Sequence, residues 1–176
     1  MFVAIWPDES TLKRLSMLDL GNTQGLRMVR PEHWHITLRF LGEVDETLTP
    51  AIVDSLRAAA ETITGPVHCK VGPATACFDS ERVLQIPVRG LEHLASAVFE
   101  ATIPFVPNTK QNGSSFTGHL TLARSRRRLL DPAEQSSLAG IPFRATFDVD
   151  YFDLVASRLS SKGPDYTTLM RVPVTG

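Results

Sequence analysis

The sequence contains the same short pattern twice. His-Ile-Thr-Leu at residues 35–38 recurs as His-Leu-Thr-Leu at residues 119–122. Imidazole titrates near neutral pH, so two histidines offer one general base and one general acid. Threonine hydroxyls offer hydrogen-bond donors to phosphoryl oxygens. The two motifs therefore predict acid–base cleavage of a phosphodiester, with His35 and His119 as the catalytic residues.

A β-strand is the element that positions such side chains. Both copies lie in apolar stretches rich in β-forming residues. Residues two apart point to the same face of a strand, so Thr37 lies beside His35 and Thr121 beside His119. Because the two histidines are far apart in the sequence, strands from two halves of the chain must bring them together. We expect both threonines to bind the substrate phosphate.

Two arginines come after the motifs and suit phosphate through their planar guanidinium groups. Arg39 is four residues after His35, so the period of two predicts the same face and a substrate-binding role. Arg124 is three residues after Thr121, and a regular strand does not put these two strictly on one face. A strand end or a bulge turns Arg124 toward the phosphate. The basic run at 126–128 is interpreted as a solvated charge cluster.

The histidines also allow other interpretations. A lone histidine on a strand is more often a core or surface residue than a catalyst, but two matching copies favour the catalytic interpretation. His33 and His35 share a face and suggest a metal site, yet no carboxylate or cysteine lies nearby at ligand spacing. Cys69 and Cys77 have no spacing typical of a zinc site or disulfide framework. We expect no metal and no cofactor.

Composition places the chain among ordinary globular proteins. Its 176 residues are 43% hydrophobic and 21% charged, which predicts one domain over residues 1–176 with its own core. The net charge of −1 argues against a general nucleic-acid coat protein. The N-terminus lacks the basic region of a signal peptide, and no apolar segment reaches transmembrane length. We expect a cytoplasmic enzyme with no membrane contact and no obligate protein partner.

Hydrophobic periodicity predicts strands that alternate with helices in an α+β fold. The motif strands occupy comparable places in two halves, each followed after a linker by a helix that starts at an aspartate. This suggests a duplicated plan with a pseudo-two-fold axis and the site between the halves. Strands are expected at 2–6, 26–30, 33–42, 67–78, 82–88, 116–124, 143–156 and 166–172, and helices at 8–20, 45–62, 91–102 and 131–138.

Segments along nearly the whole chain match the signatures of one known family. The most specific are HITLRFLGEV at 35–44 and HLTLAR at 119–124, and shorter matches lie at 2–5, 82–84, 116, 157, 163 and 166. On these residues the chain resembles the 2H phosphoesterase superfamily, and most closely the bacterial RNA 2′,3′-cyclic phosphodiesterases, also called 2′-5′ RNA ligases. Gly118 stands where that family usually has proline, which predicts a looser backbone before His119.

The resemblance carries its own expectations. It implies a bilobal fold whose antiparallel sheets line a central cleft with helices outside, and it implies no metal. It implies hydrolysis of a 2′,3′-cyclic phosphate, on RNA 3′ ends or small cyclic nucleotides, to a 2′-phosphate. His119 would activate water, His35 would protonate the departing 3′ oxygen, and Thr37, Thr121 and Arg124 would bind the phosphate. Two alternatives stay open, namely reversible 2′-5′ RNA ligation and a non-catalytic module that binds RNA ends.

Overall fold

The computed structural model describes residues 1–78, 82–106, 116–125, 130, 132–161 and 163–174. Within these residues the strands form one antiparallel path in the order β10-β9-β1-β3-β7-β6-β4-β8, with β2 on β7 and β5 on β6. The expected α+β class with antiparallel strands is confirmed. The strands are β1 (Phe2–Ile5), β2 (Leu26–Met28), β3 (Ile36–Phe40), β4 (His68–Val71), β5 (Ala76–Phe78), β6 (Val83–Arg89), β7 (His119–Ser125), β8 (Ala145–Asp148), β9 (Tyr151–Ser160) and β10 (Gly163–Pro173).

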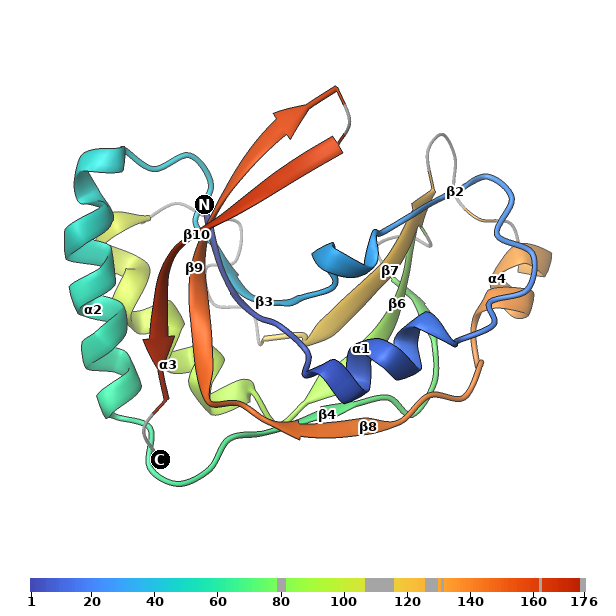
Figure 1. The fold of residues 1–176 in the computed structure, drawn as a ribbon, viewed down its shortest axis with the longest axis horizontal. Coiled ribbons are helices and arrows are strands. Elements are labelled where there is room, and N and C mark those ends of the chain that lie inside the picture. The colour runs from blue at the N-terminus through green and yellow to red at the C-terminus, as the bar shows by residue number, and fades with distance from the viewer. Residues whose placement is uncertain (79–81, 107–115, 126–129, 131, 162, 175–176) are drawn as a thin grey trace.

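Helices cover the outer face of this curled sheet. Helices α2 and α3 lie side by side against the half of the sheet that contains β3 and β10, as Figure 1 shows. Helix α1 is capped by Asp8, whose carboxylate accepts a hydrogen bond from the backbone of Thr11. No described helix is long and apolar enough to cross a membrane. The helices are α1 (Glu9–Ser16), α2 (Thr49–Glu61), α3 (Glu92–Thr102) and α4 (Pro132–Leu138), with 3₁₀ turns at Pro31–His33, Glu46–Leu48 and Ile103–Phe105.

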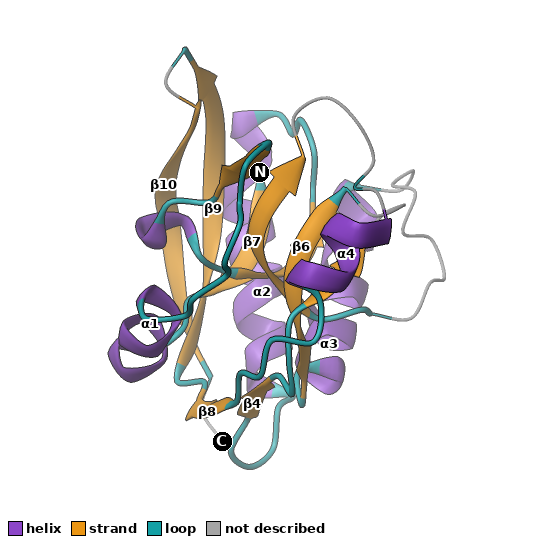
Figure 2. Cartoon of the chain, turned by 90° about the vertical axis from the view of Figure 1, so that its right-hand side faces the viewer, coloured by secondary structure: helices purple, strands orange, loops and turns teal. Residues whose placement is uncertain are grey.

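The segment expected as one strand at 143–156 is two strands, so that prediction was wrong. The chain bends at Val149 and Asp150, after which β9 begins. Strand β8 pairs with β4 at one end of the sheet, whereas β9 pairs with β1 and β10 at the other. The alternation of apolar and polar residues continues from Ala145 through the bend to Tyr151, so hydrophobic periodicity does not reveal the bend. Figures 1 and 2 show the β9–β10 hairpin extending beyond the rest of the sheet.

The apolar side chains form two clusters. The large one fills the space between the sheet and its helices and includes Ile36, Leu120 and Phe152. The small one lies on the opposite face of β1 and β9. It consists of Phe2, Ala4 and Val155, with Trp6 and Tyr166 packed against them. This small cluster forms the apolar support of the site described next.

Candidate active site

A cleft of about 960 Å³ opens where the two halves of the sheet meet. All four side chains of the repeated motifs line it, together with Arg124. The structure therefore brings together five of the six side chains that the sequence singled out. They are His35, Thr37, His119, Thr121 and Arg124.

The register between β3 and β7 explains this convergence. The two strands are antiparallel, and within the described residues they pair through Ile36 and Leu120. Both of these side chains are fully buried on the core face. Their neighbours point to the other face, and counting one residue from the pair sets His35 opposite Thr121. The same count sets Thr37 opposite His119, so each histidine faces the threonine of the other motif.

A β-bulge comes after each motif at the same position. Along β1 and β3 the register skips Leu38, and along β6 and β7 it skips Leu122. Such an extra residue reverses the facing of everything beyond it on the bulged strand. The cleft face of β3 therefore continues at Phe40, and that of β7 at Arg124. The bulge that the position of Arg124 required is present.

The first bulge also makes the expectation for Arg39 wrong. This arginine is only 1% exposed and does not line the cleft, because it points to the core face. Its guanidinium donates hydrogen bonds to the backbone carbonyls of Phe99 and Val106 and lies 4.2 Å from the ring of Phe99. These carbonyls belong to the end of α3 and the turn after it. Arg39 therefore has a structural role there.

Both catalytic candidates are anchored through the same ring atom. Nδ1 of His35 lies 2.7 Å from the carbonyl oxygen of His33, and Nδ1 of His119 lies 2.9 Å from that of Thr117. A carbonyl only accepts hydrogen bonds, so each Nδ1 carries a proton. In the neutral rings Nε2 then holds the lone pair. The repeated contact, two residues back in each motif, fixes the same tautomer at both histidines.

The surroundings of His35 favour its neutral form. The pKa of His35 is lowered to about 4, chiefly by removal from water. The bond to the His33 carbonyl opposes this shift, and the positive charges of His33, His119 and Arg124 contribute to it. His35 is therefore neutral at pH 7 in the free protein. Once protonated, the His35 ring is a stronger acid than an ordinary imidazolium.

Aromatic rings surround His35 on its buried side. The ring centroids of Phe2, Tyr166 and Trp6 lie 5.0, 5.4 and 5.5 Å from that of His35. Tyr166 also packs on His33 at 4.6 Å, and burial raises the pKa of its phenol. These contacts are the apolar surface that removes His35 from water. Tyr166 itself lines the cleft.

Sequence reasoning missed other parts of the cleft. The exposed ring of Phe40 lies in it, because the bulge turns it there. At the far end, Arg158 of the β9–β10 hairpin lies 3.8 Å from the carboxylate of Glu46 in the turn before α2. No sequence signal relates these two segments, since their proximity depends on sheet order. The basic run at 126–128 lies outside the described residues.

Gly118 is not a loose point in the backbone, so that expectation was wrong. Its carbonyl accepts a hydrogen bond from the backbone N–H of Val88 at 2.8 Å. A Cβ atom at this position would lie 2.6 Å from the carbonyl oxygen of Val88 and 3.0 Å from the ring of Phe116. Glycine is required here by the close approach of β6, and it sets the backbone immediately before His119.

The metal alternative finds no donor set in the described part of the chain. No group of three or more histidine, cysteine, aspartate or glutamate side chains there is arranged to hold a metal ion. Nε2 of His33 is instead within hydrogen-bond distance of the Arg30 guanidinium, at 3.1 Å. The imidazoles, hydroxyls and guanidinium that line the cleft suit proton transfer and anion binding.

A curled antiparallel sheet with two His-x-Thr strands on one cleft is the arrangement expected of a 2H phosphoesterase. The family described as LigT like Phosphoesterase matches residues 7–70. An RNA 2′,3′-cyclic phosphodiesterase of Archaeoglobus fulgidus is 30% identical over 180 residues, covering 96% of this chain and 97% of the relative. The chain belongs to this family of LigT-like phosphoesterases.

Solved structures agree with the fold. The crystal structure of TT0787 of Thermus thermophilus matches with a TM-score of 0.82 and 25% identity, covering 98% of this chain and 96% of that one. Escherichia coli LigT complexed with 3′-AMP matches with a TM-score of 0.74 and 23% identity, covering 99% and 97%. The fold is thus similar to these solved structures over nearly the whole length of the chain.

Proposed function

We propose that the protein is an RNA 2′,3′-cyclic phosphodiesterase that hydrolyses the cyclic phosphate of an RNA 3′ end, or of a small nucleotide, to a 2′-phosphate. One observation carries the proposal: His35 and His119 lie on one cleft with the same carbonyl-anchored tautomer, so both present Nε2 for proton transfer. The Archaeoglobus fulgidus relative bears the name of this activity.

The proposed reaction needs one base and one acid. Nε2 of His119 takes a proton from water as the water oxygen bonds to phosphorus. The bond from phosphorus to the 3′ oxygen breaks, and that oxygen takes a proton from Nε2 of His35. The sum is addition of one water molecule, which leaves a 2′-phosphate. Thr37, Thr121 and Arg124 bind the non-bridging oxygens, where negative charge increases in the transition state.

The low pKa of His35 fits the acid role once substrate is bound. Desolvation makes its imidazolium a strong acid toward the departing oxygen. The anionic phosphate opposes the cationic charges that disfavour this imidazolium, so binding of substrate and proton support each other. The assignment of His119 as base and His35 as acid follows the family and is part of the proposal.

The test uses a 2′,3′-cyclic mononucleotide and a short RNA that ends in a 2′,3′-cyclic phosphate, both in excess EDTA. We expect turnover of each, with a 2′-phosphate as the product in ³¹P NMR. Binding without turnover favours the RNA-end-binding alternative. Activity that EDTA abolishes and added metal restores overturns the metal-free scheme. Supplying RNA with a free 5′-hydroxyl tests for ligation as the reverse reaction.

A further inference from the structure

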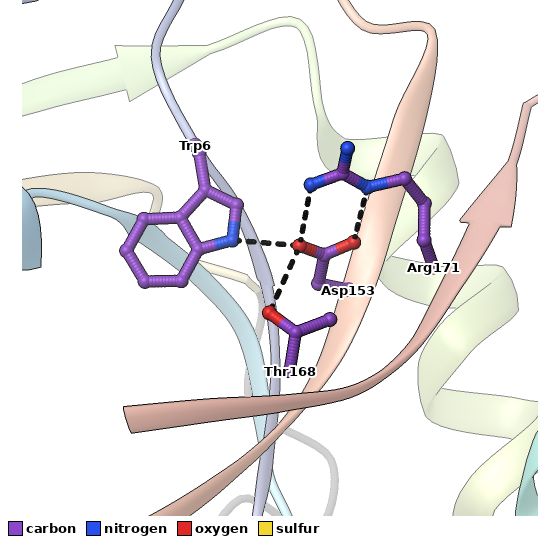
Figure 3. A network of polar contacts seen from close by, with 4 residues as sticks. All are labelled: Trp6, Asp153, Thr168 and Arg171. Carbon is purple, nitrogen blue, oxygen red and sulfur yellow. Dashed lines mark hydrogen bonds and ion pairs between the residues drawn. The ribbon is translucent and has the colours of Figure 1, made fainter. Parts of the chain in front are cut away.

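A buried carboxylate lies beneath the aromatic side of the cleft. Asp153 of β9 is fully buried, and its oxygens accept hydrogen bonds from three residues, as Figure 3 shows. Arg171 donates twice, at 3.0 and 3.2 Å, and the Thr168 hydroxyl once, at 3.4 Å. The indole Nε1 of Trp6 donates to the same carboxylate at 3.0 Å.

Strand pairing brings these side chains to the face that carries the site. Asp153 pairs with Ala4 of β1 on one side and with Arg171 of β10 on the other. Ala4 in turn pairs with Thr37, which lines the cleft. A buried carboxylate needs a cationic partner, and Arg171 already supplies it. The additional bond to Trp6 is not needed for charge compensation, so it points to a second role.

Trp6 connects the carboxylate to the proposed general acid. Its ring centroid lies 5.5 Å from that of His35, and the two rings are tilted by 56°. Nδ1 of His35 is hydrogen-bonded to the His33 carbonyl. This hydrogen bond alone does not fix the plane of the imidazole ring, so packing by neighbouring side chains must limit its rotation. Phe2 and Tyr166 contact the same imidazole, and like Trp6 they belong to the small apolar cluster or pack against it. Trp6 differs because a hydrogen bond to a buried group fixes its own orientation.

We propose that Trp6, held by Asp153, is a positioning residue for His35 that fixes the plane of the imidazole and keeps water from its buried side. The role rests on the proposed function, in which Nε2 of His35 must point at a departing oxygen. A displacement of about 1 Å in such a group costs on the order of a hundredfold in rate. The charged or titratable groups that face His35 directly are His33, His119, Arg124 and Tyr166. Asp153 thus acts through the indole.

The test compares Trp6→Phe, Asp153→Leu and Thr168→Val with the wild type. The first removes the indole N–H and keeps a ring, and the second removes the acceptor at similar size. Thr168→Val is the matched control, because it removes the other neutral donor to Asp153 and leaves the bond to Trp6. For each folded variant, ¹⁵N-histidine NMR follows the tautomer and titration of His35, and steady-state kinetics give kcat and KM for a cyclic mononucleotide.

We expect Trp6→Phe and Asp153→Leu to raise the titration midpoint of His35 by about one pH unit or more, because water reaches the ring. We expect both variants to lower kcat by about tenfold or more with KM little changed, because the orientation of the His35 imidazole is lost while substrate binding is kept. Thr168→Val leaves both readouts as in the wild type. If Trp6→Phe or Asp153→Leu folds and titrates like the wild type with unchanged kcat, the positioning role is overturned.

The NMR readout needs no turnover, so it separates this inference from the proposed function. A wild type that does not hydrolyse cyclic phosphates, with His35 still shifted by the two variants, removes the proposed function and supports the positioning of His35 by Trp6. If the wild type hydrolyses cyclic phosphates but neither variant shifts the titration of His35, the proposed function is supported and the positioning role of Trp6 is overturned. Should one of the two variants fail to fold, the other decides.

Discussion

Ile36 of β3 pairs with Leu120 of β7 at the centre of the sheet, and each is the residue next to a motif histidine. The two copies of the motif are therefore related by an antiparallel pair, in which a local two-fold axis exchanges the strands. The leucine after each threonine forms a bulge in both copies. This relationship places the histidine and threonine of both motifs on one cleft. Acid–base cleavage of a phosphodiester requires such a pair, with one imidazole as the base and the other as the acid.

Loss of either histidine ring is expected to lower kcat on a 2′,3′-cyclic mononucleotide by roughly 10²–10⁴, the range for a general acid or base. His35→Gln and His119→Gln test this, while Thr37→Val and Thr121→Val are expected to cost about one to two decades, because other donors to the phosphate remain. His68→Gln is the control, since His68 pairs with Asp148 at the far end of the sheet. Near-wild-type turnover by either histidine variant contradicts its assigned role.

The pH dependence of kcat/KM is set by the lowered pKa of His35. Activity needs one imidazole protonated and the other neutral, so the bell is bounded by the pair's two apparent pKa values. The lower limb is expected near pH 4, because His35 has a pKa of about 4 in the free protein. In kcat the same limb moves to higher pH, since bound phosphate favours the imidazolium. A lower limb of kcat/KM at pH 6 or above contradicts this environment.

The same shift predicts a loss of stability in acid. The pKa of His35 is about 4 in the folded chain and near 6.5 when unfolded, so between these values the unfolded chain binds the extra proton. Stability thus rises with pH across this window. From pH 7 to pH 5 the wild type is expected to lose about 2 kcal/mol more than His35→Gln, which lacks this titration. Urea unfolding of both proteins at the two pH values measures the difference.

Sequence reasoning found the motif side chains because two simple regularities held. The period of two is intact from His35 to Thr37 and from His119 to Thr121, and duplication implied a shared site. It failed for Arg39, because one extra residue per strand reverses the facing of every later residue on that strand. In β3 apolar and polar residues alternate without a break past Leu38 to Phe40, so the sequence pattern carries no trace of the bulge before Arg39.

The sequence also could not predict the contacts around the site that depend on the order of strands in the sheet. Trp6 and Asp153 come from opposite ends of the chain and meet because β1 pairs with β9. The alternation of apolar and polar residues continues across the bend between β8 and β9 and breaks only at Phe152, so it does not reveal where β9 begins. A lone carboxylate in the apolar segment 151–155 was a visible signal of a buried polar partner.

Gly118 supplies a prediction about the backbone before His119. In Gly118→Ala the new Cβ meets the Val88 carbonyl at 2.6 Å, so the segment must move away from β6. We expect a loss of about 1–3 kcal/mol in unfolding free energy, typical of overpacking, and a fall in kcat as the anchor of His119 at Thr117 shifts. Gly140→Ala is the comparison for a substitution with open space, although its positive φ adds strain. Equal stability of Gly118→Ala and wild type contradicts the close approach.

Substitutions of Arg39 and Arg124 are expected to have opposite effects, because Arg39 has a structural role and Arg124 is proposed to bind the substrate. Arg39→Leu leaves two part-buried carbonyls, one in α3 and one after the turn that follows it, without their cationic donor, so we expect a loss of about 2–3 kcal/mol in unfolding free energy. Arg124 is exposed on the cleft, and Arg124→Gln is expected to leave stability within about 0.5 kcal/mol. It raises KM for the cyclic mononucleotide about tenfold or more, as one charged contact to phosphate is lost.

Arg124→Gln also removes one of the positive charges that lower the pKa of His35, so the lower limb of kcat/KM moves to higher pH. Arg39→Leu, studied below its melting temperature, keeps the wild-type KM and pH limb. Urea unfolding and pH-dependent kinetics give the unfolding free energy, the KM and the lower pH limb of both variants. A raised KM in Arg39→Leu contradicts the core facing of Arg39 and returns this residue to the candidates for phosphate binding. An unchanged KM in Arg124→Gln contradicts the cleft facing that the second bulge gives Arg124.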